Sequence, residues 1–96
     1  MDHLQSALAE LEQAIAQIEA SGPVAEKGTV IEVCLQSNGK HYARKRNGKK
    51  FKGCGRQGSD KHKEAIASVQ RRAALEDLKE LIRAIRALQN SEHWHG

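Results

Sequence analysis

The sequence contains few aromatic residues: Tyr42, Phe51 and Trp94 are the only three among 96 residues. Its core must therefore be built from Leu, Ile, Val and Ala. No apolar run approaches the roughly 20 residues of a membrane-spanning helix, and the first ten residues, MDHLQSALAE, lack the basic and apolar blocks of a secretory signal. We therefore expect one cytoplasmic domain, residues 1–96, with no membrane partner.

Cysteine is also scarce, with only Cys34 and Cys54 and no C-x-x-C pair. No zinc framework is visible in this spacing. On the outer strands of a three-stranded sheet the two thiols would lie beyond disulfide reach, so we expect both to be reduced. A partial metal site formed by His41, His62 and Cys54 is a minor alternative.

Catalytic patterns are missing as well. The serines have no His and acidic partner at a recognisable spacing, and the carboxylates fall on expected helices, where they form ordinary surface pairs. We expect no enzyme, no metal, no cofactor and no small-molecule substrate.

Charge is distributed very unevenly along the chain. Residues 1–26 carry a net charge of −5, residues 27–63 carry +9 and residues 64–96 are neutral. A basic segment between acidic and neutral flanks is typical of a surface that binds phosphate groups.

Two segments have the apolar spacing of helices. Leu4, Leu8, Leu11, Ile15 and Ile18 recur every three or four residues and predict a helix over residues 1–21. A second such pattern predicts a long helix over residues 59–90, with Ser59 as its N-cap and residues 91–96 as a tail. The two apolar stripes predict that the helices pack together, within one chain or between two copies.

The segment between the helices, residues 28–54, predicts a three-stranded antiparallel sheet. Its apolar and basic runs are separated by Asn38-Gly39 and Asn47-Gly48, both strong hairpin signals. If both pairs form two-residue turns, one face of the sheet carries the large apolar side chains: Ile31, Val33, Leu35, Tyr42 and Phe51. The long helix would cover this face, which gives an α+β fold.

The sequence GCGRQG, Gly53–Gly58, matches the G-x-G-x-x-G pattern of dinucleotide-binding loops. That reading requires a second parallel strand downstream, and only helical pattern follows. We therefore interpret the glycines as a sharp turn into the helix. Amide groups at the start of that helix suit a nucleic-acid phosphate, flanked by Arg56, Lys61 and Lys63.

The polar face of the sheet provides the candidate binding residues. A sheet of this size fits the major groove of DNA, where side chains reach bases and flanking cations hold phosphates. Lys45, Lys50 and Lys52 would supply charge, and Gln36 and His41 would supply hydrogen bonds. Arg44, Arg46 and Lys49 would contact the backbone near the second turn.

Two resemblances accompany this interpretation. A three-stranded sheet followed by a helix is similar to the plant AP2 domain and to the amino-terminal domains of some tyrosine recombinases, which read the major groove with the sheet. The stretch GKHYARKRNGKKFKGCGRQGSDKHKEAIASVQRRAALEDL resembles the core of small cyanobacterial proteins, with H-x-x-A-I leading to R-R. The second resemblance spans roughly residues 28–80 and implies a bacterial origin, with no established activity.

The sequence therefore predicts a protein that binds nucleic acid, DNA before RNA, and that dimerises through its helices. The alternative is a protein-interaction or assembly module in which the acidic first helix binds a partner. Salt dependence separates the two, because nucleic-acid affinity falls steeply with ionic strength.

Overall fold

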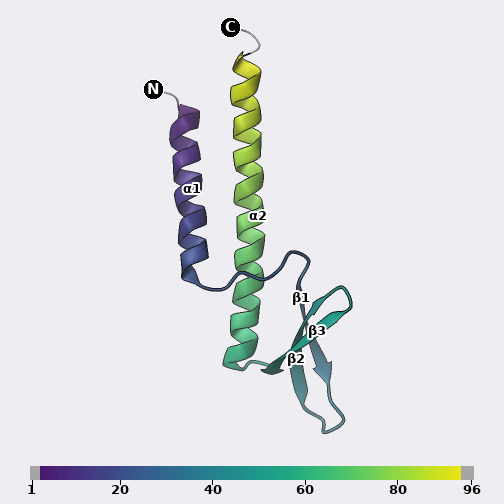
Figure 1. Ribbon diagram of the computed structural model, residues 1–96. Helices are drawn as coiled ribbons and strands as arrows, with labels where there is room; N and C mark the ends of the chain where they lie inside the picture. The colour runs from purple at the N-terminus through teal and green to yellow at the C-terminus, as the bar shows by residue number, and fades with distance from the viewer. Residues whose placement is uncertain (1–2, 94–96) are drawn as a thin grey trace. The chain divides into compact units, whose positions relative to one another are not determined.

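The computed structural model describes residues 3–93 and contains two helices and three strands (Figure 1). In chain order these are α1 (His3–Ser21), β1 (Val30–Leu35), β2 (His41–Asn47), β3 (Lys50–Arg56) and α2 (Asp60–His93). The strands form one antiparallel sheet in the order β1-β2-β3. This confirms the α+β prediction. Helix α2 continues to His93, three residues beyond its predicted end, and Trp94 and His95 lie outside the described residues.

The chain folds as two compact units. Unit 1 consists of Met1–Gly22 and Ala73–Gly96, and unit 2 consists of Pro23–Arg72. Helix α2 contributes its second part to unit 1 and its first part to unit 2.

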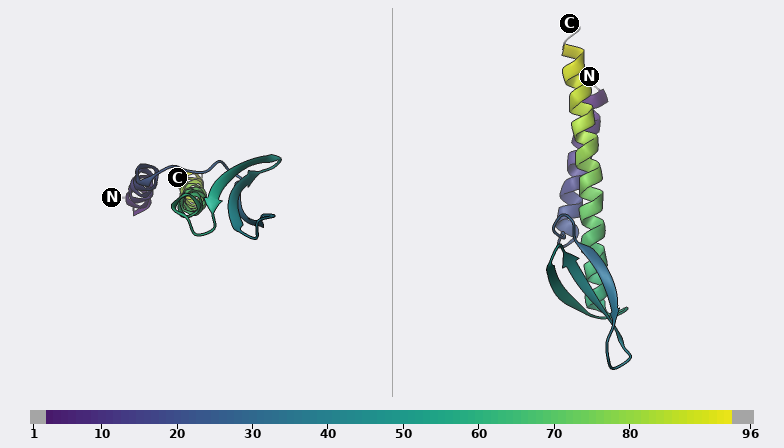
Figure 2. Two further views of the ribbon diagram at one scale, coloured as in Figure 1. Left: turned by 90° about the horizontal axis from the view of Figure 1, so that it is seen from below. Right: turned by 90° about the vertical axis from the view of Figure 1, so that its right-hand side faces the viewer.

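Unit 1 is a pair of helices. Helix α1 runs beside the second part of α2 in both Figure 1 and Figure 2. Leu8 of α1 is buried, as are Leu75 and Ile82 of α2, in agreement with the predicted apolar stripes. At the surface, an Arg86 nitrogen lies 3.5 Å from a Glu12 carboxylate oxygen. The long C-terminal helix thus contacts the first one, as the sequence predicts.

Unit 2 places the first turns of α2 on one face of the sheet. Its core consists of Ala43 of β2, Cys54 of β3 and Ala65 of α2, with Ile31 of β1 packed against them. These side chains are small, so the helix backbone lies close to the strands. The connecting segment also joins α2, because the Ala25 amide donates to the Ser68 carbonyl at 3.1 Å.

The first hairpin has a longer turn than predicted. The Gln36 amide donates to the Lys40 carbonyl at 2.9 Å, which leaves three residues in the loop. Gly39 has a φ of +81°, as the last residue of a three-residue hairpin loop requires. Asn38 stabilises this turn by accepting a hydrogen bond from the Lys40 amide at 3.0 Å. The predicted pair Leu35–Tyr42 is therefore wrong, and Leu35 pairs with His41 instead.

The second turn is shifted by one residue. Asn47 pairs with Lys50, so Gly48 and Lys49 form the turn, and Gly48 has a φ of +61°. Asn47 stays in the strand because its side-chain amide donates to the Lys27 carbonyl at 3.0 Å and to the Thr29 hydroxyl at 3.2 Å. Phe51 consequently pairs with Arg46 and not with Arg44 as predicted.

A bulge in β3 completes the sheet. Tyr42 pairs with Arg56 and Arg44 with Gly53, so two β3 residues, Cys54 and Gly55, lie opposite Ala43. Gly55 has a φ of +76°, a conformation that glycine adopts without strain at bulges. The bulge directs Cys54 toward the helix and into the core.

These registers redistribute the side chains between the two faces of the sheet. Side chains alternate along a strand, so the face that α2 covers contains Val33, Leu35, Ala43 and Cys54. Tyr42 and Phe51, which were predicted for the covered face, lie on the opposite face. The predicted single apolar face is wrong because the first loop is one residue longer than a two-residue turn.

Candidate functional site

The sheet face that points away from α2 is called the outward face here. It contains residues from all three strands: Val30, Glu32, Cys34, Tyr42, Arg44, Arg46, Phe51 and Gly53. Arginine, which binds phosphate groups, therefore shares one surface with Tyr and Phe, whose rings can stack on bases.

Glu32 organises the two arginines of this face. One of its carboxylate oxygens accepts hydrogen bonds from Arg44 Nε at 3.0 Å and Nη2 at 2.9 Å. The other oxygen accepts a hydrogen bond from Arg46 Nε. The hydrogen bond from Arg46, followed by those from Arg44, holds the pKa of Glu32 below its ordinary value. Glu32 is thus a carboxylate at neutral pH and fixes both guanidinium groups.

Phe51 is held against one of these guanidinium groups. The Arg44 Cζ atom lies 4.4 Å from the centroid of the Phe51 ring, which is the geometry of a cation–π contact. The ring nevertheless remains 56% exposed. An aromatic side chain is therefore presented at the surface in a defined orientation.

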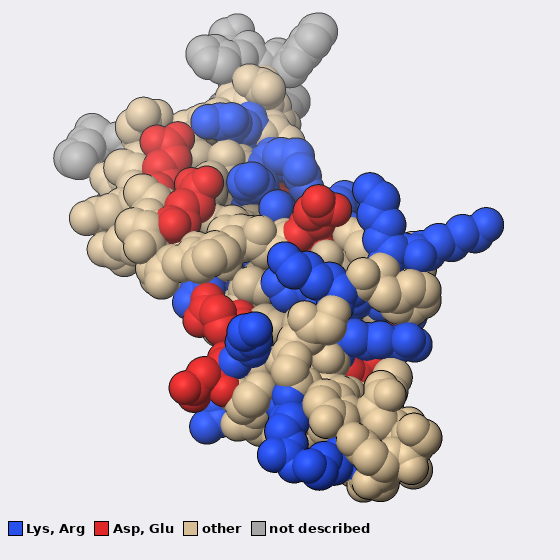
Figure 3. Space-filling model, turned by 60° about the horizontal axis from the view of Figure 1, so that its bottom comes forward, with Lys and Arg blue, Asp and Glu red and all other residues tan. Residues whose placement is uncertain are grey.

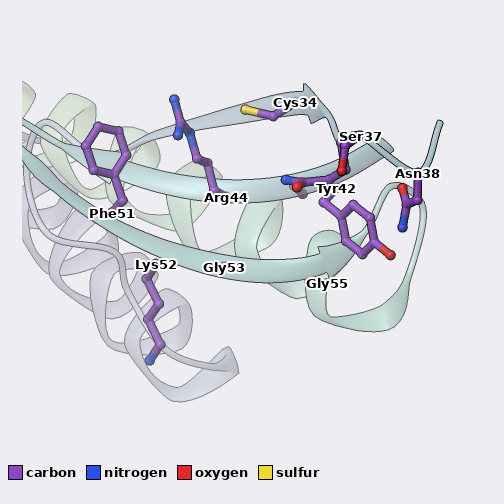
Figure 4. Close-up of a pocket in the computed structure, with 11 residues that line it drawn as sticks. Cys34, Ser37, Asn38, Tyr42, Arg44, Phe51, Lys52, Gly53 and Gly55 are labelled. Carbon is purple, nitrogen blue, oxygen red and sulfur yellow. The ribbon is translucent and has the colours of Figure 1, made fainter. Parts of the chain in front are cut away.

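An open hollow of about 520 Å³ lies on this face. Figure 4 shows Phe51 at one end of it, Tyr42 at the other, Arg44 between them and Gly53 on the strand below. Ser37 and Asn38 of the first turn close the end beside Tyr42. Gln36, one of the predicted site residues, also lines the hollow.

A second hollow, on the α2 side of the sheet, gathers lysines. It measures about 320 Å³, and its lining includes Lys45, Lys52 and Lys61, which we call the lysine cluster. Lys45 and Lys52 pair directly across the β2–β3 ladder. Glu64 also lines this hollow, but its carboxylate already contacts Arg71 at 2.9 Å.

Lys52 connects the two hollows. It lines both of them, because β3 is an edge strand and its side chains are accessible from either side. In Figure 4 the Lys52 side chain points away from Phe51 and Arg44. A ligand that crosses the β3 edge would meet lysine on one side and aromatic rings on the other.

The remaining predicted residues are spread over unit 2. Lys49 lies in the second turn and Lys50 beside it, and both are exposed. His41 is exposed at the start of β2, opposite Leu35. Arg56 and Lys63 are exposed on either side of the turn into α2. The structure thus brings together two of the predicted lysines on β2 and β3 with Lys61, and separately brings Arg44 together with Arg46.

The glycine-rich turn is satisfied internally. The Gln57 amide donates to the His41 carbonyl at 3.0 Å and the Gly58 amide to His62 Nδ1 at 2.9 Å. Ser59 is the predicted N-cap, and its hydroxyl accepts a hydrogen bond from the His62 amide at 3.3 Å. A phosphate at this helix start would have to displace these acceptors, so the candidate binding surface lies on the sheet and at Lys61.

The same contacts explain His62 and the cysteines. His62 is buried with its Nδ1 occupied by Gly58. Cys34 and Cys54 are both free, on opposite faces of the sheet. Among the residues the structure describes, no group of three or more His, Cys, Asp or Glu side chains is arranged to hold a metal ion.

Sequence reasoning missed the residues that shape the outward face. Glu32 was assigned no role, and Phe51 and Tyr42 were assigned to the core. The available signal was the position of Glu32 between two apolar strand residues, opposite a strand rich in arginine. A carboxylate at a cross-strand position favours a cationic partner there.

Comparison with protein families, curated proteins and solved structures gives no match for this chain. Within residues 3–93, neither helix is long and apolar enough to cross a membrane.

Proposed function

We propose that this protein binds nucleic acid through unit 2, with DNA preferred over RNA, and that it has no catalytic activity. The lysine cluster carries the proposal. Like charges directly opposite in a sheet destabilise it, yet Lys45 and Lys52 are paired in this way and Lys61 lines the same hollow. Within the described part of the chain, none of the three forms an ion pair. An anionic partner would relieve this repulsion.

The charge of the whole unit supports the same partner. Unit 2 contains 13 Lys and Arg against 4 Asp and Glu, a net charge of +9, whereas unit 1 contains 3 against 8, a net charge of −5. Figure 3 shows Lys and Arg side chains over much of one face, with Asp and Glu among them. A polyanion would therefore be attracted to unit 2 and repelled by unit 1.

The test is fluorescence anisotropy with labelled DNA and RNA at several salt concentrations. We expect affinity to fall steeply with salt, because bound cations are released from the phosphates. The variant Lys52→Glu with Lys61→Glu should lose at least about tenfold in affinity at low salt and should reduce the salt slope by about 2, one for each lost phosphate contact.

The matched control reverses two charges in unit 1. Lys79→Glu with Arg83→Glu, both exposed on α2, changes the net charge of the protein by the same amount. We expect this control to retain most of the affinity. If the two double variants lose affinity equally, the net charge of the protein governs binding and the lysine cluster does not.

The second candidate function is a protein-interaction or assembly module formed by the helices. Leu81 and Leu88 favour it, because these two leucines lie seven residues apart on α2 and are exposed, a spacing that places them on one face of a helix. A homodimer or another apolar helix would cover them. Light scattering of the free protein measures this directly, and association through leucines would change little with salt.

A further inference from the structure

We propose that the hollow on the outward face holds an unpaired base of a single-stranded nucleic acid. This inference rests on the proposed function and adds the class of substrate: a strand whose bases are not stacked in a duplex. The lysine cluster would hold phosphates without regard to the form of the nucleic acid, whereas the hollow would recognise the free face of a base.

The first observation is the state of Phe51. Large apolar side chains are normally withdrawn from water, yet Phe51 is more than half exposed. Its orientation is fixed by the Arg44 guanidinium, 4.4 Å from the ring centroid, and Arg44 is fixed in turn by Glu32. An exposed ring that is already ordered loses little side-chain entropy when a base stacks on it or on the adjoining guanidinium plane.

The second observation is the space beside it. A Cβ atom built at Gly53 would meet no heavy atom within 4 Å, so the floor of the hollow between Phe51 and Tyr42 is open. The volume of about 520 Å³ lies in the range of about 300–1,000 Å³ that is typical of small-molecule sites. The hollow therefore has room for a base with its sugar.

The third observation is the set of polar groups around the hollow. Gln36 and Asn38 line it, and side-chain amides can both donate to and accept from the edge of a base. Lys52 lines it from the β3 edge and is also a member of the lysine cluster. A strand that crosses β3 would thus place its backbone on lysine and turn a base onto the outward face.

A duplex does not provide this ligand. Its bases are stacked on one another, and only unpaired bases expose a face to aromatic side chains or guanidinium groups. The combination of an ordered ring, an open floor and cations at the edge is therefore better matched to a single strand than to a paired one.

The experiment compares a single-stranded thymidine oligomer, the matched uridine oligomer and a DNA duplex of the same length, at fixed salt. Two variants alter the hollow. Gly53→Val fills its floor, at a position with an ordinary φ and no heavy atom within 4 Å of the added Cβ. Phe51→Leu removes the ring and keeps an apolar side chain. Leu35→Ala, an exposed apolar residue on the other face of the sheet, is the control.

We expect the wild-type protein to bind the single strands more tightly than the duplex. Each hollow variant should weaken single-strand binding by about 5- to 150-fold, the range for loss of one stacked base, and should leave duplex binding and the circular dichroism spectrum unchanged. Leu35→Ala should behave as wild type. Tighter binding of the thymidine or of the uridine oligomer would identify DNA or RNA as the natural strand.

Equal binding of single strands and duplex by wild type and both hollow variants would overturn this inference and leave the proposed function standing. An equal loss of affinity for single strands and duplex in Phe51→Leu would also overturn it, because the ring would then stabilise the folded protein instead of stacking on an unpaired base. If wild type binds none of the oligomers at low salt, the proposed function itself fails. Should Gly53→Val fail to fold, Phe51→Leu decides the outcome.

Discussion

The two units of this chain differ in the size of the apolar side chains that they bury. Unit 1 has a net charge of −5 and buries Leu8, Leu75 and Ile82. Unit 2 has a net charge of +9, and the side chains buried at the centre of its sheet are no larger than alanine and cysteine. Four large apolar residues of the strands, Val30, Val33, Leu35 and Phe51, are exposed, and only Ile31 packs partly buried against the core. The helical pair thus buries large side chains as a folding core does, whereas the sheet exposes most of its large apolar side chains as an interaction surface does.

Directional contacts compensate for the small core of unit 2. Arg72 Nε donates to the Ala25 carbonyl at 2.7 Å, and the Asn47 side chain donates to the Lys27 carbonyl at 3.0 Å. Together with the Ala25–Ser68 backbone bond, they tie residues 23–29 to α2 and to the sheet. A hydrogen bond of this kind contributes about 0.5–1.5 kcal/mol. The position of the strands therefore depends on several weak contacts, while unit 1 depends on a few buried side chains.

The largest loss of stability should follow from removing one of the buried side chains of unit 1. Leu75 is 2% exposed, and Leu75→Ala should lower the free energy of unfolding by about 2–5 kcal/mol through lost burial and the cavity it leaves. Urea denaturation followed by circular dichroism measures this loss. Leu88→Ala, at a position 57% exposed, makes the same chemical change on the same helix and should shift stability by less than about 0.5 kcal/mol. Similar losses for both variants would refute the leucine core of unit 1.

A smaller effect should follow from enlarging the core of unit 2. Ala65 is 2% exposed and contacts Ala43 and Cys54, so Ala65→Leu forces α2 away from the strands at a cost of about 1–3 kcal/mol. Urea denaturation gives the stability, and amide hydrogen exchange shows which unit opens. We expect faster exchange in β2 and β3 than in α1. A protein stabilised by this substitution would show that the small-residue core contains unfilled space.

The fold could be predicted from the sequence because each element has its own local signal. The 3.6-residue periodicity of the helices, the two Asn-Gly pairs and Ser59 as N-cap identified all five elements. The register could not be predicted, since it depends on what each asparagine contacts. Asn38 bonds within its turn, whereas Asn47 bonds to Lys27 and Thr29, and these partners precede β1 in the chain. Identical dipeptides thus form different turns.

The candidate site, too, could be predicted only in part from the sequence. The basic segment was identifiable by counting charges, and Lys45 and Lys52 do share a face. That face is the one that α2 covers, so the prediction that these lysines lie on the exposed face, away from the helix, is wrong. The outward face was not, because a single extra loop residue moves Tyr42 and the arginines to the side opposite the helix. Phe51 is of a residue type that is usually buried, yet it lies on the surface. Only the pairing of β3 reveals this.

The smallest effect on stability concerns the salt bridge that joins Glu32 to Arg44 and Arg46 on the outward face, and it depends on pH. Because hydrogen bonds from Arg46 and Arg44 lower the pKa of Glu32 below its ordinary value of 4.5, the folded state binds the proton more weakly than the unfolded chain. The bridge therefore stabilises the fold above about pH 4.5, and this contribution is lost as the pH falls through the lowered pKa. Glu32→Gln lacks it at every pH. We expect the wild-type urea midpoint to exceed that of the variant above the ordinary pKa of 4.5, and the two midpoints to converge as the pH falls through the lowered pKa of Glu32. A constant difference between the two proteins across this range would mean that Glu32 acts through packing and not through its charge, and the ordering of Arg44 over the Phe51 ring would then need another cause.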